Sequence, residues 1–176
     1  VLKNLPLGSY KIVEKTAPEG FVLNEEAQTV TFSYKDQKTP VIEQTAAFEN
    51  DRQKVEVSVV KQDAENETVV AGAEFGLYAK EDILAHGEVI VKADTLLGKA
   101  VSNEQGKAVF DLDLLFGTYY IKELTAPAGY VSSFETLEVT AKYQGQDVKV
   151  VKLESVFKNQ PTKVTFKKSD ITTGVE

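Results

Sequence analysis

Three polar residues in this 176-residue chain are of the types that can form an isopeptide bond and assist its formation: Lys61, Glu123 and Asn159. A neutral lysine amine is a nucleophile and a carboxamide carbon is an electrophile. A carboxylic acid beside them can hydrogen-bond the amide oxygen and pass protons to the leaving ammonia. The product would be an isopeptide bond between Lys61 and Asn159, made once and without turnover.

The same residue types recur in the flanking sequence, as Glu14, Asn50 and Lys168. The interval from Glu14 to Glu123 equals the interval from Asn50 to Asn159, and the interval between the two lysines is nearly the same. The chain thus contains a repeat of about 110 residues, a usual size for one domain. We therefore predict a complete domain at residues 52–160. Residues 1–51 would be the C-terminal part of a preceding domain, and residues 161–176 the first strand of a following one.

Each of the three residues ends an apolar stripe. Residues two apart share one face of a strand, so Lys61 follows Val57 and Val59, and Glu123 follows Tyr119 and Ile121. Burying a charged lysine or glutamate costs several kcal/mol unless it is paired or neutralised. Desolvation lowers the pKa of a lysine and raises that of a glutamate, so a buried pair can exchange a proton and become neutral. A solvated head group at a strand end explains one such residue, but not a set that recurs.

Strand patterns dominate the chain, with short alternating segments rich in Val, Phe and Tyr and Gly-bearing turns between them. "NEQG" and "YQGQ" are predicted hairpin turns. Residues 80–98, "KEDILAHGEVIVKADTLLG", interrupt the pattern and are predicted to be an insertion that starts with a short helical turn. The predicted fold class is all-β: tandem immunoglobulin-like or transthyretin-like antiparallel sandwiches, one complete and two partial.

Composition excludes several kinds of function. The net charge of −7 and the lack of a basic cluster argue against nucleic acid as a partner. No apolar stretch is long enough to span a bilayer, so we expect no membrane insertion in this segment. The chain has no Cys and one His, His86, which is predicted to be a solvated loop residue. We therefore expect no metal site, no cofactor and no catalytic triad.

The segments "YYIKELTAPAGY" and "YKIVEKTAPEGF" resemble the E-box of CnaB-type domains, also called SpaA-like or prealbumin-like domains, of Gram-positive pilins and surface adhesins. The second segment ends in Phe21 where the family has Tyr. The resemblance implies a β-sandwich with an intramolecular bond from Lys61 to Asn159, promoted by Glu123. It also implies that Glu14 and Asn50 match the promoter and the acceptor of the preceding copy, and that Lys168 matches the donor of the next one.

The resemblance further implies a secreted structural module, a stalk or backbone domain at the bacterial cell surface or wall, whose partners are neighbouring domains of the same chain. Because its chemistry acts on itself, it would not be an enzyme on external substrates. The alternative is an adhesin domain that recognises a host protein or glycan through the insertion at residues 80–98. A further hypothesis is that the tail adds to the front fragment of another molecule, with Lys168 reacting with Asn50.

Overall fold

The computed structural model describes residues 2–85 and 87–168. His86, predicted to be a loop residue, and residues 169–176 lie outside this part of the chain. The described residues form eleven strands: β1 (Gly8–Ile12), β2 (Gln28–Phe32), β3 (Lys54–Asp63), β4 (Glu74–Ala79), β5 (Ile83–Ala85), β6 (Glu88–Val91), β7 (Leu96–Val101), β8 (Lys107–Phe110), β9 (Gly117–Thr125), β10 (Thr136–Ala141) and β11 (Val150–Asn159). None of the described segments is a helix that could cross a membrane.

The chain divides into two compact units, which are described separately. The first comprises Val1–Lys54 with Lys142–Val151, and the second comprises Val55–Ala141 with Lys152–Glu176, each in its described part. β1 and β2 of the first unit pair antiparallel, with Tyr10 opposite Val30. The loop at residues 142–149 packs against the segment between β1 and β2. The Ala17 backbone N–H donates to the side-chain oxygen Oε1 of Gln146 at 2.9 Å.

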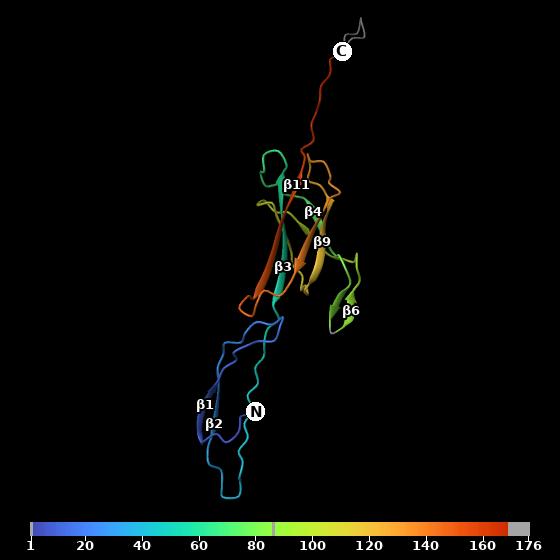
Figure 1. The fold of residues 1–176 in the computed structure, drawn as a ribbon. Helices are drawn as coiled ribbons and strands as arrows, with labels where there is room; N and C mark the ends of the chain where they lie inside the picture. The colour runs from blue at the N-terminus through green and yellow to red at the C-terminus, as the bar shows by residue number, and fades with distance from the viewer. Residues whose placement is uncertain (1, 86, 169–176) are drawn as a thin grey trace. The chain divides into compact units, whose positions relative to one another are not determined.

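The second unit is a sandwich of two sheets (Figure 1). One sheet has the order β10-β9-β4-β7 and the other the order β11-β3-β8. Alternate residues of both sheets point inward and are buried, and the Phe75 and Phe157 rings meet edge to face at 5.3 Å. The predicted all-β sandwich is thereby confirmed.

The first and last strands of this unit, β3 and β11, are neighbours in one sheet. The Ser58 hydroxyl lies 3.4 Å from the Glu154 carboxylate, and the Ala64 N–H donates to the Asn159 carbonyl at 3.0 Å. Both strands therefore advance in the same direction, and their C-terminal ends, which hold Lys61 and Asn159, lie at the same end of the sheet.

Residues 80–98 differ from the prediction. Their described residues form a β-hairpin, β5 and β6, and the start of β7, and none of these described residues is in a helical turn. Ile83 of β5 is buried and packs closely on Gly117 of β9. A Cβ atom at Gly117 would lie only 2.6 Å from the Ile83 Cδ1 atom. The β-branched residues Ile83, Val89, Ile90 and Val91 lie in the two strands of this hairpin and favour strands over a helix.

The two predicted hairpin turns also differ from the prediction, because neither of them joins two paired strands. "NEQG" is a compact turn in which the Gly106 N–H donates to the Asn103 carbonyl at 2.8 Å, but it joins β7 to β8, which lie in different sheets. "YQGQ" lies between β10 and β11, which are likewise in different sheets. A Gly-bearing turn fixes a local reversal and does not decide which strands pair.

Candidate site for an intramolecular crosslink

The sandwich brings the three predicted residues to one end of its core. Lys61 lies near the end of β3 and Asn159 at the end of β11, in one sheet, whereas Glu123 lies on β9 of the facing sheet. Their exposed fractions are 0%, 2% and 5%. Each side chain continues an inward-facing apolar row, so the fold carries all three into the core.

Asn159 and Glu123 contact each other directly. The Asn159 Nδ2 atom donates to Glu123 Oε2 at 2.8 Å and lies 3.0 Å from Oε1, and it also donates to the Val131 carbonyl at 2.7 Å. The Ser133 backbone N–H donates to Glu123 Oε2 at 3.1 Å, which holds the carboxyl group from the other side. The carboxyl group therefore faces the amide nitrogen, not the amide oxygen.

The amide oxygen of Asn159 is buried and has no hydrogen-bond partner among the described residues. A buried polar atom without a partner is rare in folded proteins and costs about 1–3 kcal/mol. Such an atom is often found where a chemical or functional role offsets the cost.

The Lys61 amine is fully buried. It donates to the backbone carbonyl of Gln62 at 2.9 Å and lies 5.2 Å from the centroid of the Tyr130 ring. Burial lowers its pKa, and this effect is opposed by the negative charges of Glu123 and Asp63, which raise it. The net direction is downward, toward the neutral amine that can act as a nucleophile.

The E-box loop after β9 covers this end of the sandwich. Its turn is closed by the Tyr130 N–H, which donates to the Pro127 carbonyl at 3.2 Å, and Gly129 takes a left-handed φ of 87°. The loop then pairs with the chain that follows β11. The Val131 N–H donates to the Gln160 carbonyl at 2.9 Å, and the Thr162 N–H donates to the Gly129 carbonyl at 2.8 Å.

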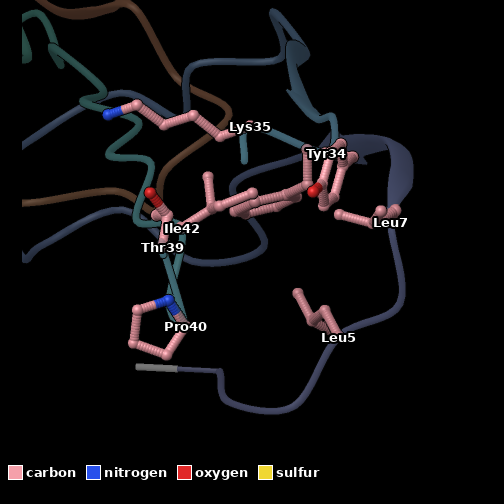
Figure 2. Close-up of a pocket in the computed structure, with 8 residues that line it drawn as sticks. Leu5, Leu7, Tyr34, Lys35, Thr39, Pro40 and Ile42 are labelled. Carbon is pink, nitrogen blue, oxygen red and sulfur yellow. The ribbon is translucent and has the colours of Figure 1, made fainter. Parts of the chain in front are cut away.

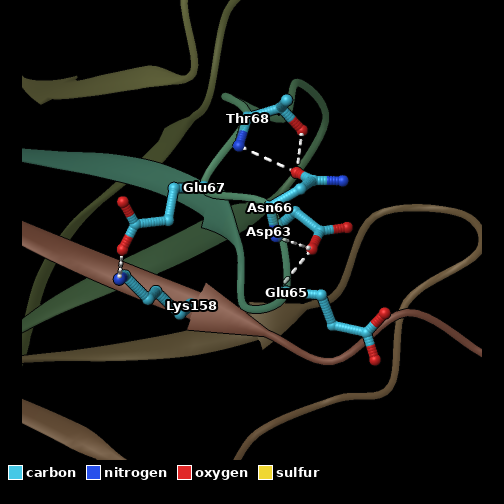
Figure 3. A network of polar contacts seen from close by, with 6 residues as sticks. All are labelled: Asp63, Glu65, Asn66, Glu67, Thr68 and Lys158. Atoms are coloured by element: carbon cyan, nitrogen blue, oxygen red, sulfur yellow. Dashed lines mark hydrogen bonds and ion pairs between the residues drawn. The ribbon is translucent and has the colours of Figure 1, made fainter.

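Sequence reasoning gave no role to Asp63. It is buried, shares a strand face with Lys61, and accepts the Tyr130 hydroxyl at 3.0 Å. The signal was present, because a Lys-x-Asp pair places both side chains on one face of a strand. Figure 3 shows Asp63 at the start of a loop whose Glu67 forms a 2.6 Å ion pair with Lys158.

The first unit makes the same contacts at the equivalent positions of the repeat. The Val22 N–H donates to the Asp51 carbonyl and the Gln53 N–H to the Gly20 carbonyl, both at 2.8 Å. The amide nitrogen of Asn50 likewise donates to Glu14 Oε2 at 2.6 Å and to the Val22 carbonyl at 2.9 Å. Both predicted promoter and acceptor pairs are therefore in contact, and in the same orientation.

The two copies differ in burial. Glu14 and Asn50 are half-buried, whereas Glu123 and Asn159 are buried. The first unit also has an open pocket of about 230 Å³ (Figure 2), lined by Leu5, Leu7, Phe32, Tyr34, Lys35, Thr39, Pro40 and Ile42. In the repeat, Leu5 and Phe32 are equivalent to Leu114 and Ala141, which belong to the buried core of the second unit. This pocket is thus the face that corresponds to core in the complete sandwich.

The predicted donor Lys168 is exposed and lies outside any strand. Residues 162–168 have no assigned strand, and Val164 and Phe166 are 94% and 89% exposed. The rest of the predicted opening strand lies outside the described residues, so that strand remains a prediction. In the described part of the chain, no three His, Asp or Glu residues are placed to hold a metal ion together.

A family model described as SpaA, a prealbumin-like fold domain, matches residues 1–46 and 55–155. Among solved structures, the chain is similar to the Bacillus anthracis TIE protein, with 28% sequence identity and a TM-score of 0.59 over 91% of this chain and 26% of that one. Comparison with curated proteins gives no match.

The chain is also similar to the full-length major pilin SpaD from Corynebacterium diphtheriae, with 21% identity and a TM-score of 0.48 over 68% of this chain and 33% of that one. A third similar structure is BcpA, the major pilin subunit of Bacillus cereus, with 24% identity and a TM-score of 0.42 over 61% of this chain and 29% of that one. The chain spans a third or less of the length of each of these three proteins.

Proposed function

Because this chain belongs to the SpaA family of prealbumin-like fold domains, we propose that it is a structural stalk or backbone segment of a bacterial cell-surface protein, stabilised by a bond that it forms within itself. The similarity to the major pilins SpaD and BcpA supports the structural role. The observation that carries the crosslink is the buried Asn159 amide, whose nitrogen contacts Glu123 and whose oxygen has no partner among the described residues.

The proposed organisation is tandem. Residues 52–160 would be one complete domain, residues 1–51 the end of a preceding copy, and residues 161–176 the beginning of a following one. The repeated hydrogen bonds around Glu14 and Glu123 support this division, as does the open pocket on the first unit. Secretion to the cell surface and contact with neighbouring domains of the same kind follow from this role.

The proposed reaction joins the Lys61 amine to the side-chain carbon of Asn159. The neutral amine attacks the carboxamide carbon, the new C–N bond forms, and the bond from that carbon to Nδ2 breaks. The products are one secondary amide and one ammonia, so atoms and charges balance. A lowered Lys61 pKa supplies the neutral amine.

Glu123 would act on the leaving nitrogen. Its carboxyl group lies within hydrogen-bond distance of Asn159 Nδ2, so a proton taken from the attacking amine can be delivered to the group that departs. The same carboxyl group can form a hydrogen bond with the amide oxygen, the role predicted from the sequence, only if the carboxamide turns over, because Nδ2 now occupies that position.

The bond would close a loop of about 100 residues, which in the chain-entropy model stabilises the folded state by on the order of 4 to 5 kcal/mol. It would also join the first and last strands of the sandwich. A pulling force on the ends of the domain would then act on a covalent bond before it separates most of the sheet, which suits a stalk.

The test is the intact mass of the purified chain. We expect a mass lower than the sequence mass by one ammonia, and a peptide map in which Lys61 and Asn159 are linked. Glu123→Ala should restore the full mass while circular dichroism still reports a folded β-protein. A full mass in well-folded parent protein would refute the crosslink.

The second candidate function is ligand binding through residues 80–98. The observation in its favour is the β5–β6 hairpin, on which Leu84, Val89 and Ile90 are 57%, 44% and 53% exposed. A host protein or glycan would be the partner. Replacement of these three side chains by Ser or Thr should abolish adhesion of cells that display the protein if the hairpin is the binding surface. Unchanged adhesion would dismiss this role.

A further inference from the structure

The end of the core above Lys61 is covered by a tyrosine that is hydrogen-bonded to a buried aspartate. The Tyr130 hydroxyl donates to Asp63 Oδ2 at 3.0 Å, and the centroid of the same ring lies 5.2 Å from the Lys61 amine. Asp63 is 4% exposed and Lys61 is fully buried. The ring thus lies against the amine, and its hydroxyl group is hydrogen-bonded to the strand that carries the amine.

Asp63 is itself held rigidly. Its Oδ1 atom accepts the backbone N–H of Glu65 at 2.7 Å and that of Asn66 at 3.2 Å, which leaves Oδ2 for Tyr130 (Figure 3). These hydrogen bonds lower the pKa of Asp63, with the Glu65 N–H as the largest cause. The same pairing raises the pKa of the Tyr130 hydroxyl. Asp63 therefore stays ionised and Tyr130 stays a donor at neutral pH.

The fold of the loop does not require this hydroxyl. At the equivalent position of the first unit, Phe21 forms the same turn, with its N–H on the Pro18 carbonyl at 3.1 Å, and the same type of bridge, to Arg52. A phenyl ring is therefore sufficient for the turn. The Lys-x-Asp spacing of Lys61 and Asp63 also recurs in the sequence at Lys168 and Asp170.

We propose that Tyr130 and Asp63 form a latch that keeps water away from the Lys61 amine and restricts the amine to the reaction site. Both are positioning residues, since they act through Lys61. This inference rests on the crosslinking reaction proposed above. The phenol ring supplies the cover, and the Asp63 carboxylate anchors the ring on the strand that carries the nucleophile.

The latch has two separable effects on the amine. The titratable groups that face Lys61 are Glu123 from β9, Asp63 from β3 and Tyr130 from the loop after β9. The carboxylate of Asp63 favours the ammonium form, whereas the covering ring excludes water and favours the neutral amine. Removal of the charge and removal of the anchor should therefore change the reaction in different ways.

The experiment measures the rate of ammonia loss by intact mass. The full chain is recovered from inclusion bodies in denaturant, where the reaction site does not exist, and is refolded by dilution into buffers over a range of pH. Tyr130→Phe removes the anchor and keeps the ring. Asp63→Asn removes the charge. Its amide oxygen can still accept the Glu65 and Asn66 N–H groups, and its amide nitrogen can then donate to the Tyr130 hydroxyl oxygen, so the ring stays anchored.

The matched control is Tyr120→Phe. The Tyr120 hydroxyl makes a similar bond, to Asp94 Oδ1 at 3.1 Å, but Tyr120 lies between the inward-facing Tyr119 and Ile121 and so points away from the core. Loss of this second hydroxyl tests whether any Tyr-to-Asp bond affects the rate through general stability.

For Tyr130→Phe we expect the limiting rate to fall on the order of tenfold, because a hydrogen bond to a charged group is lost. For Asp63→Asn we expect a limiting rate within about twofold of the parent and a pH midpoint lower by about one unit, because a neighbouring negative charge no longer stabilises the ammonium form. Tyr120→Phe should match the parent in both.

The proposal of a latch is wrong if Tyr130→Phe and Asp63→Asn react with the parent's rate and pH midpoint. It is also wrong if they alter only the melting temperature, measured in a Glu123→Ala background where no crosslink forms. These outcomes differ from a failure of the proposed function, in which the refolded parent itself keeps its full mass.

Discussion

The amide nitrogen of Asn159 lies 2.8 Å from Oε2 of Glu123 and 3.0 Å from Oε1, so the carboxyl group faces the atom that the proposed reaction expels. Asn50 and Glu14 have the same orientation in the first unit, at 2.6 Å. The Val131 and Val22 carbonyls explain it, because each accepts the amide nitrogen of its copy and would repel an amide oxygen at that position.

Asn159→Asp should change the leaving group. We expect a chain that loses one water in place of one ammonia, at a rate that passes through a maximum as the pH falls, because the Lys61 amine must be neutral and is protonated at low pH. Two carboxyl groups at hydrogen-bond distance cannot both ionise easily, and the reaction needs the new carboxyl group in its protonated form. Intact mass against time after refolding measures both features. Asn159→Ala, which has no carbonyl group to attack, should keep its full mass.

Glu123→Gln should leave the chain folded but without the crosslink. We expect the free energy of unfolding to fall by about 4 kcal/mol, the contribution of the closed loop in the chain-entropy model. Urea unfolding followed by fluorescence or circular dichroism measures the change. The matched variant is Glu14→Gln, which alters the equivalent carboxyl group of the first unit. It should leave the mass deficit of the chain unchanged, and a loss of the deficit in this variant would contradict the assignment.

The pH dependence of stability should differ between linked and unlinked chains. The pKa of Lys61 in the folded, unlinked chain lies below its usual value of 10.5 because of burial. The folded state therefore binds fewer protons than the unfolded state in the pH range between these two values, and stability rises as the pH rises through it. Unlinked Asn159→Ala should thus gain stability toward pH 10.5.

Two comparisons make this prediction specific. Asn159→Ala combined with Lys61→Met should lose the alkaline gain, because no amine is left to titrate. The crosslinked parent should lose it as well, since its Lys61 nitrogen is an amide. Urea midpoints over the alkaline range provide the measurement. A gain of the same size in all three chains would assign it to other groups.

The intact chain should contain one crosslink and remain monomeric on a denaturing gel. We expect a mass deficit of a single ammonia, and Asn50→Ala should not change it. A ladder of covalent multimers that disappears in Lys168→Arg and in Asn50→Ala would show instead that the tail of one molecule reacts with the front unit of another.

Much of the candidate site could be predicted because it depends on the period of a strand. Val57, Val59 and Lys61 share a face in any regular strand, and the same holds for Tyr119, Ile121 and Glu123. All six are buried in the structure. The sequence repeat added the positions of Glu14 and Asn50, and the structure reproduces their contact.

Prediction failed where pairing between distant segments decides the outcome. β7 has no clean alternation, since Leu96 is exposed, Leu97 to Lys99 have no buried residue, and Ala100 is buried. Its pairing with β4 makes it a strand. Residues 80–98 were predicted to be an insertion that starts with a short helical turn, because the charged residues at its start do not exclude one. The segment instead contains the β5–β6 hairpin.

The sequence by itself determined the strand period, the repeat, and the three residues that share the core: an amine, a carboxyl group and a carboxamide. Only the tertiary structure decided which atom of the carboxamide faces Glu123 and which ring covers Lys61. The physical reason is that a strand pattern specifies the face on which a side chain lies. The partner of each atom depends on groups from other strands, such as the Val131 carbonyl and the Asp63 carboxylate, whose positions are fixed only when the two sheets pack.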